Sequence, residues 1–183
     1  MINIIVFMGP SASGKSTIRE LMKLKKVTTY TTRPKRENEI DGIDYHFTDE
    51  DTLKYMINNG KLLEYSKYGN YYYGSSIISM QEAIDKNEIV SIILDKNGAM
   101  DIKRIFKEKV LIIGVKAPIN ECIERMEARR EKDIEVRVNS FNEEIQNVCD
   151  ISDIIINNSK SNWENIRNII CIIRRLYEQK HTV

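Results

Sequence analysis

The sequence predicts an α/β fold built on a parallel sheet, and three observations support this class. Short runs of apolar, β-branched residues recur along the chain, as expected of strands buried on both faces. Polar stretches with helical periodicity separate these runs, which is the pattern of a parallel sheet covered by helices. A length of 183 residues favours one domain, with inserted subregions where the rhythm breaks. The predicted strands are Ile2–Met8, Ile89–Leu94, Val110–Val115 and Ile154–Ile156.

The helices are predicted from apolar spacing and from residues typical of helix ends. The first strand ends at Gly9-Pro10, and a helix is expected over Ser16–Lys26. Pro118 suits the first turn of a helix that continues to about Arg129. Ser161–Glu178 has the apolar spacing of a closing helix.

Two stretches interrupt this alternation. Residues Thr31–Ser76 are polar and rich in Tyr and Gly, with one helix signature in which Thr48 is the N-cap and Asp51 follows three residues later. We expect this stretch to form an inserted lobe with short strands. The charge-dense segment Arg129–Glu135 is either a solvated turn or a mobile lid.

Composition excludes several classes of protein. The net charge of +1 provides no overall field for binding nucleic acid or an anionic membrane, and the apolar runs are too short to span a bilayer. Three widely spaced cysteines are expected to be buried free thiols in a reducing cytoplasm. Two histidines leave little room for a His-based triad or metal site.

Residues 9–16 contain the pattern G-x-x-x-x-G-K-S and are followed by Thr17. Glycines at these positions allow successive backbone N–H groups to point at one anion, and the lysine reaches the outer phosphates of a nucleotide. The loop follows a buried strand and opens a helix, which favours a triphosphate site over a purely structural loop. The predicted triphosphate-binding residues here, which the family resemblance described below assigns to ATP, are Gly9, Pro10, Ser11, Ala12, Ser13, Gly14, Lys15, Ser16 and Thr17.

Two further clusters lie in the expected lobe. In Thr31–Arg36, two arginines flank a proline, and guanidinium groups bind a monophosphate through two oxygens at once. Taken alone, this basic loop is more typical of a solvated surface than of a phosphate site. Glu64 is followed by the tyrosine-rich stretch Gly69–Ser75, which alone predicts only a hairpin with an exposed glutamate.

In this order, the three clusters resemble the guanylate kinase family. Its phosphate loop, its T-T-R-x-x-R-x-x-E-x-x-G-x-D-Y-x-F segment and its E…G-N-Y-Y-G-S segment are matched at Gly9–Thr17, Thr31–Phe47 and Glu64–Ser75, and L-D-x-x-G-A is matched at Leu94–Ala99. The resemblance implies a three-layer fold of the P-loop NTPase type within one domain, residues 1–183. Its implied subregions are a core (1–30, 77–128 and 149–183), a GMP-binding lobe (31–76) and a short lid (129–148).

The resemblance also implies an activity and a site. The activity is Mg²⁺-dependent phosphate transfer from ATP to GMP by a cytoplasmic monomer or homodimer that binds neither nucleic acid nor membrane. The implied catalytic residues are Lys15, Arg129 and Arg137, and Asn157 lies near the adenine. Glu64 and Ser75 match guanine readers, and Ser16 and Asp95 match metal ligands. The full set of implied GMP-binding residues is Thr29, Arg33, Arg36, Tyr45, Glu64, Tyr73, Ser75 and Asp95.

Two departures from the family pattern keep alternatives open. Ile93 stands where the family often has an acidic residue, and Arg130 replaces the glycine that usually follows the first lid arginine. A kinase for a different or modified purine monophosphate is therefore one alternative. The other is a non-catalytic interaction module, although such modules are expected to lose the lysine that is present here as Lys15.

Overall fold

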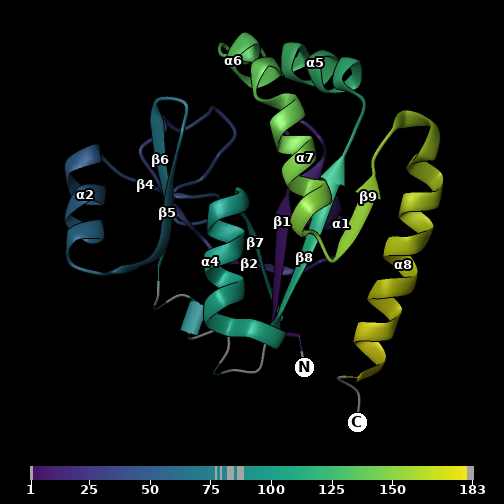
Figure 1. Ribbon diagram of the computed structural model, residues 1–183, viewed down its shortest axis with the longest axis horizontal. Helices are drawn as coiled ribbons and strands as arrows, with labels where there is room; N and C mark the ends of the chain where they lie inside the picture. The colour runs from purple at the N-terminus through teal and green to yellow at the C-terminus, as the bar shows by residue number, and fades with distance from the viewer. Residues whose placement is uncertain (1, 77, 79, 82–84, 86–88, 181–183) are drawn as a thin grey trace. The chain divides into compact units, whose positions relative to one another are not determined.

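The computed structural model describes residues 2–76, 78, 80, 81, 85 and 89–180 (Figure 1). Its strands form a five-stranded sheet in the order β2-β7-β1-β8-β9 and a four-stranded sheet in the order β4-β3-β6-β5. In the larger sheet, β2 pairs with β7 and β8 pairs with β9, both in parallel. The predicted α/β class with a parallel sheet is thus confirmed.

The chain forms two compact units, and β1 (Ile4–Met8) contributes residues to both. Unit 1 comprises Met1–Ile5 and Lys25–Val110, and unit 2 comprises Val6–Leu24 and Leu111–Val183. Residues Ile4 to Phe7 of β1 have no exposed surface, as a central strand of a parallel sheet requires.

Unit 1 holds the smaller sheet, strands β2 and β7 of the larger sheet, and helices of its own. The strands are β2 (Lys25–Lys26), β3 (Tyr30–Thr31), β4 (His46–Phe47), β5 (Leu62–Tyr68), β6 (Tyr71–Ser76) and β7 (Val90–Ile93). The helices are α2 (Glu50–Asn58), α4 (Lys96–Phe106) and the short 3₁₀ helix η1 (Lys107–Lys109). Strands β5 and β6 form an antiparallel hairpin around Gly69, whose φ of 59° lies in the left-handed region that favours glycine. The predicted tyrosine-rich hairpin is therefore present.

Unit 2 holds the loop after β1 and most of the remaining helices. Its elements are α1 (Lys15–Leu21), β8 (Val110–Lys116, whose first residue belongs to unit 1), α5 (Ile119–Ala128), α6 (Ile134–Asn139), α7 (Phe141–Ile151), β9 (Ile154–Asn157), the 3₁₀ helix η2 (Lys160–Asn162) and α8 (Trp163–Lys180). Ala117, Cys122 and Phe141 form a small apolar cluster against which Ala12 of the loop packs.

Three local predictions are wrong. The first helix ends at Leu21 rather than Lys26, because Lys23 adopts a left-handed φ of 52° and the chain then pairs with β7 as strand β2. Helix α2 is capped by Asp49 instead of Thr48, and the Asp49 carboxylate accepts a hydrogen bond from the Thr52 N–H at 2.7 Å. All three cysteines are free thiols, but only Cys122 is buried.

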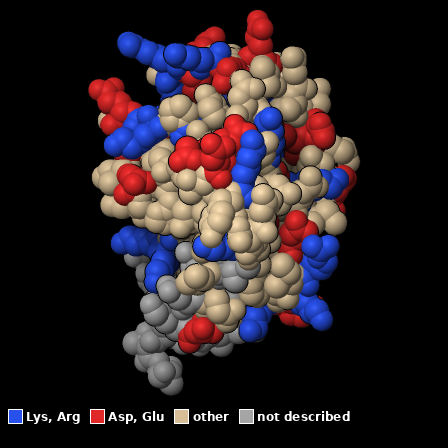
Figure 2. Space-filling view, turned by 90° about the vertical axis from the view of Figure 1, so that its left-hand side faces the viewer, with Lys and Arg blue, Asp and Glu red and all other residues tan. Residues whose placement is uncertain are grey.

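The surface carries charges of both signs side by side. On the face shown in Figure 2, Lys and Arg are interspersed with Asp and Glu, in keeping with the net charge of +1. Among the described residues, every helix is too short or too polar to cross a lipid bilayer.

Candidate functional site

The loop between β1 and α1 has the backbone geometry of a phosphate cradle. Gly9 and Gly14 have φ values of 137° and 101°, and Ala12 is also left-handed with a φ of 58°. Such alternation turns successive N–H groups toward one point. A Cβ on Gly9 would lie 2.1 Å from the Val115 carbonyl oxygen, and one on Gly14 would lie 2.1 Å from the Asn158 amide nitrogen. Gly9 is therefore required by sterics as well as by conformation, whereas Gly14 is required by its left-handed φ and by the space that the Asn158 side chain occupies.

Four residues that the motif did not identify support this loop. Arg125 donates to the Ala12 carbonyl at 3.1 Å and to Glu121 at 2.8 Å. The buried Asn158 donates its amide to the Ser13 carbonyl at 2.7 Å. The Glu121 carboxylate also accepts from the backbone N–H of Lys160 at 3.1 Å. Since these residues come from α5 and from the segment after β9, no local sequence signal links them to the loop.

The Lys15 side chain folds back onto the phosphate loop. Its ammonium donates to the carbonyls of Gly9 and Pro10 at 2.6 and 2.7 Å. Burial lowers the pKa of Lys15 from 10.5 to about 8, although the nearby carboxylate of Glu144 opposes this. The side chains of Ser16 and Thr17 are exposed on the first turn of α1, so their hydroxyls are accessible.

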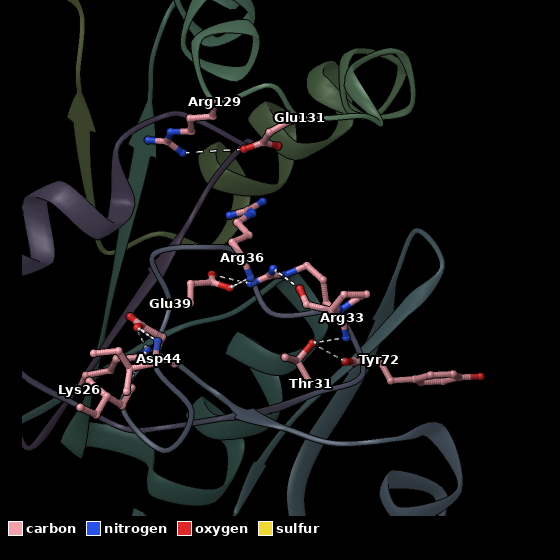
Figure 3. A network of polar contacts seen from close by, with 12 residues as sticks. Lys26, Thr31, Arg33, Arg36, Glu39, Asp44, Tyr72, Arg129 and Glu131 are labelled. Carbon is pink, nitrogen blue, oxygen red and sulfur yellow. Dashed lines mark hydrogen bonds and ion pairs between the residues drawn. The ribbon is translucent and has the colours of Figure 1, made fainter.

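The two predicted lid arginines share one carboxylate. Arg129 Nη1 lies 3.9 Å from Glu131 Oε1, a pair drawn in Figure 3, and Arg137 Nε lies 3.3 Å from Glu131 Oε2. Arg137 also donates to the Ser11 hydroxyl, which puts its guanidinium beside the phosphate loop. With a side chain only 8% exposed, Glu131 is held within unit 2, so the charge-dense connector is more than a solvated turn.

Asn157 and Arg130 complete the predicted features of unit 2. Asn157 is exposed at the end of β9, and its carbonyl accepts from the Asn162 amide at 3.0 Å. Arg130 has a φ of 54°, its N–H donates to Glu127 O, and the next N–H donates to Met126 O. This is the Schellman arrangement, in which glycine is the favoured residue at the left-handed position.

In unit 1, two threonines fix the start of the basic loop. Thr31 Oγ1 donates to the Tyr72 carbonyl at 3.0 Å and accepts from the Arg33 N–H at 3.1 Å. Thr32 Oγ1 accepts from the Tyr72 N–H at 2.9 Å. The Thr31–Tyr72 contacts are drawn in Figure 3. They tie the basic loop to β6, directly beside Tyr73.

Arg33 is the centre of a cluster of cation and phenol groups. Its guanidinium pairs with Glu39 at 2.6 Å and lies 5.4 Å from the ring centroid of Tyr45 (Figure 3 shows the ion pair). Burial alone would lower the pKa of Arg33, but the hydrogen bond and charge of Glu39 raise it, so the group stays charged. The Tyr45 and Tyr73 rings meet edge to face at 6.1 Å. Arg36 is exposed, and its N–H donates to Glu39 at 2.8 Å.

Glu64 is a buried carboxylate facing a small residue. It is 5% exposed, and the fully buried Ser75 donates its hydroxyl to Glu64 Oε1. A Cβ on Gly98 would lie 2.9 Å from Glu64 Oε2, so this glycine of the L-D-x-x-G-A segment leaves room for the carboxylate. Burial raises the pKa of Glu64 from 4.5 to about 7, and the charge of Asp95 adds to the rise.

Asp95 and Thr29 are the remaining predicted residues of unit 1. Asp95 caps α4, where its Oδ1 accepts from the Gly98 N–H at 2.9 Å. Thr29 is buried just before β3, and its carbonyl accepts from the His46 N–H at 2.8 Å. Unit 1 thus holds all eight predicted GMP-binding residues, and unit 2 holds the phosphate loop, Asn157, Arg129 and Arg137.

The fold and the loop define a P-loop nucleotide-binding protein. The sequence model described as guanylate kinase matches residues 1–170, and the chain belongs to the guanylate kinase family. A guanylate kinase of Streptococcus thermophilus strain CNRZ 1066 is 32% identical over 163 residues, which is 84% of this chain and 78% of the relative. One of Streptococcus agalactiae serotype III is 31% identical over 167 residues, which is 86% of this chain and 80% of the relative.

A solved structure supports the fold. The crystal structure of guanylate kinase from Anaplasma phagocytophilum superposes with a TM-score of 0.74 at 22% identity, and the match covers 100% of this chain and 87% of that one. The fold class predicted from the sequence and the family resemblance are both confirmed.

Proposed function

We propose that this protein transfers the γ-phosphate of ATP to GMP, giving ADP and GDP. The observation that carries the proposal is the buried Glu64–Ser75 pair, because a desolvated carboxylate requires hydrogen-bond donors to ionise. Guanine presents N1–H and the 2-amino group on one edge, and a carboxylate accepts from both. Adenine has an acceptor at N1 and would meet the carboxylate with repulsion. A buried polar group left unpaired discriminates between such ligands by up to about 10⁴-fold.

The phosphate of GMP is assigned to the cluster around Arg33. Guanidinium forks of Arg33 and Arg36 and the phenols of Tyr45 and Tyr73 supply donors that suit a phosphate dianion. The buried Thr29 hydroxyl is assigned to the same group. Because Glu39 keeps Arg33 oriented, the cluster is organised before the substrate binds.

The phosphates of ATP are assigned to the loop N–H groups of residues 9–17 and to Lys15, and the adenine to the region of Asn157. Phosphoryl transfer needs positive charge around the transferring group more than acid–base chemistry. Lys15, Arg129 and Arg137 provide that charge. To do so, Arg129 and Arg137 would exchange Glu131 for the phosphate, and residues 129–148 would act as the lid.

The residues present fit a Mg²⁺ ion whose ligands are mainly nucleotide phosphates and water, with few ligands from the protein. Ser16 offers an exposed hydroxyl, and Asp95 has a carboxylate oxygen besides the one that caps α4. Among the described residues, no group of three or more His, Cys, Asp or Glu side chains forms a metal cage, which suits an ion that retains its waters. When bound, Mg²⁺ neutralises the charge that develops between the β- and γ-phosphates.

The setting and organisation of the protein form part of the same proposal. Three free thiols favour a reducing cytoplasm. We assign residues 31–76 as the GMP-binding lobe of a single catalytic domain and expect a monomer or homodimer that acts on small nucleotides alone.

The proposal is tested by a coupled assay of ADP release with GMP, dGMP, AMP, IMP and UMP as acceptors. GMP is expected to give the highest kcat/KM, with AMP and UMP lower by at least about 10³-fold. A preference for another purine, such as IMP, would point to the first alternative. Failure to turn over any acceptor would point to a non-catalytic interaction module.

A further inference from the structure

Lys26 holds the turn that precedes Tyr45. It lies on β2, where it is paired with Ser91 of β7, and its side chain is 22% exposed. Its ammonium donates to the carbonyl of Ile43 at 3.1 Å and to the carbonyl of Asp44, and it lies 3.9 Å from the Asp44 carboxylate. The Lys26–Asp44 contact is drawn in Figure 3.

The turn itself is closed by hydrogen bonds among its own residues, so Lys26 acts on a defined structure. Gly42 N–H donates to the Tyr45 carbonyl at 2.8 Å, and Asp44 Oδ2 accepts from the Ile40 N–H at 2.7 Å. These bonds give the turn internal order. Asp41 Oδ1 also accepts from the Phe47 N–H of β4 at 2.9 Å, and Thr28 Oγ1 donates to the Gly42 carbonyl at 3.5 Å. Lys26 adds an attachment to a strand of the larger sheet.

Lys26 also contacts the ring of Tyr45. Its ammonium lies 4.8 Å from the ring centroid, and Arg33 lies 5.4 Å from the same centroid. A cation within about 6 Å of an aromatic ring is attracted to its face. Two cations and the rings of Phe47 and Tyr73 therefore lie around the Tyr45 ring and restrict its movement.

We propose that Lys26 is a positioning residue that orients Tyr45 for the acceptor phosphate, by holding the 40–45 turn on β2 and lying against the Tyr45 ring. The inference rests on the proposed function, in which the Tyr45 phenol donates to GMP. Direct binding of GMP by Lys26 is disfavoured, because its donors already face the carbonyls of Ile43 and Asp44. The sequence alone gave no reason to single out this lysine from its neighbour Lys25.

The test is a double-mutant cycle in the full-length protein. Lys26→Met removes the ammonium and keeps the apolar stem, and Tyr45→Phe removes the phenolic hydroxyl. We expect Lys26→Met to raise KM for GMP by about tenfold, with a much smaller change in kcat and in KM for ATP. If Lys26 acts through the Tyr45 hydroxyl, the double variant has the same KM for GMP as Tyr45→Phe alone. Lys26→Arg should recover most of the loss.

A matched control comes from the same unit. The Lys61 ammonium lies 4.9 Å from the ring of Tyr55, which has no assigned role, so Lys61→Met removes an equivalent contact and should leave KM for GMP unchanged. Additive effects of Lys26→Met and Tyr45→Phe would overturn the inference, as would an unchanged KM for GMP in Lys26→Met. Wild-type turnover of GMP is measured in the same series, and its absence would refute the proposed function instead.

Discussion

The two halves of the candidate site are built by different means. In unit 2, the phosphate loop presents backbone groups, and its shape depends on Gly9, Gly14 and a left-handed Ala12. In unit 1, the groups proposed to bind the base and the acceptor phosphate are side chains, and the central one is a buried carboxylate with a raised pKa. In the proposed function, the loop of unit 2 binds any polyphosphate of suitable length, whereas binding in unit 1 depends on which donors the ligand presents. The proposal therefore places general phosphate chemistry in one unit and substrate discrimination in the other.

The largest effect is expected from substitution of Lys15, which should impair phosphate transfer without impairing GMP binding. Lys15→Ala removes the fixed cation from the transferring phosphate, so kcat should fall by about 10³-fold or more while KM for GMP changes little. Steady-state kinetics with both substrates measures the two parameters. A variant that retained near-normal turnover would show that the loop is not the donor site.

A smaller effect is expected from loss of the hydrogen bond between Arg125 and the phosphate loop. Arg125→Met removes the donor to the Ala12 carbonyl and leaves Glu121 without its ion pair. We expect KM for ATP to rise by about tenfold, because the loop loses part of its fixed shape, and KM for GMP to stay near the wild-type value. Arg104→Met, which removes an exposed ion pair with Asp101, is the matched control and should have no effect. An equal rise in both KM values would assign Arg125 to general stability.

The pH dependence of KM for GMP tests the role proposed for Glu64 in unit 1. Only ionised Glu64 accepts both guanine donors, and with a pKa of about 7 its ionised fraction falls below that pH. Between about pH 7.5 and about pH 6 the fraction drops from about three quarters to about a tenth, so KM for GMP should rise about eightfold. The rise in KM that comes from protonation of Glu64 should be absent in Glu64→Gln. Any rise that remains in this variant comes from protonation of the GMP phosphate and can be subtracted from the wild-type profile.

The same group has the opposite effect on the stability of the unliganded protein. Because burial raises the pKa of Glu64 above its unfolded value of 4.5, its contribution to the free energy of unfolding is fully present below about pH 4.5. That contribution is lost as the pH rises through about 7. Urea titrations at several pH values give the free energy of unfolding of wild type and of Glu64→Gln. We expect this free energy to change differently with pH in the two proteins, and the same pH dependence in both would contradict the raised pKa.

The smallest effect concerns Arg130, which follows helix α5 in the proposed lid. Arg130 occupies the left-handed position of a Schellman motif with a φ of 54°, which costs a residue with a Cβ about 1 kcal/mol relative to glycine. Arg130→Gly should therefore raise the free energy of unfolding by about that amount, as measured by urea denaturation. Arg130→Ala keeps the Cβ and should give no comparable gain. Equal stability of all three proteins would mean that the backbone carries no strain there.

The contrast between the halves also explains what the sequence could predict. The phosphate loop is a local motif, so its residues and its place after a buried strand follow from the sequence alone. The pair proposed to read guanine, Glu64 and Ser75, is separated by eleven positions and follows only from the family resemblance, because Glu64 alone predicts a surface residue. Arg125, Asn158 and Lys26 were missed because their partners are backbone carbonyls of segments that are distant in sequence or in a separate turn. The helix-end errors at Thr48 and Lys26 arise where tertiary pairing or a neighbouring cap residue overrides the local pattern.

The central claim is that a buried carboxylate in unit 1 selects guanine, and the GMP/AMP preference of wild type and Glu64→Gln tests it most directly. In the variant, the amide keeps one acceptor but turns a donor toward a donor of guanine. We predict a rise in KM for GMP of about 10²-fold or more, little change in KM for ATP, and a smaller ratio of kcat/KM for GMP to kcat/KM for AMP than in wild type. If the two proteins showed the same GMP/AMP preference, Glu64 would not read the base and the central claim would be wrong.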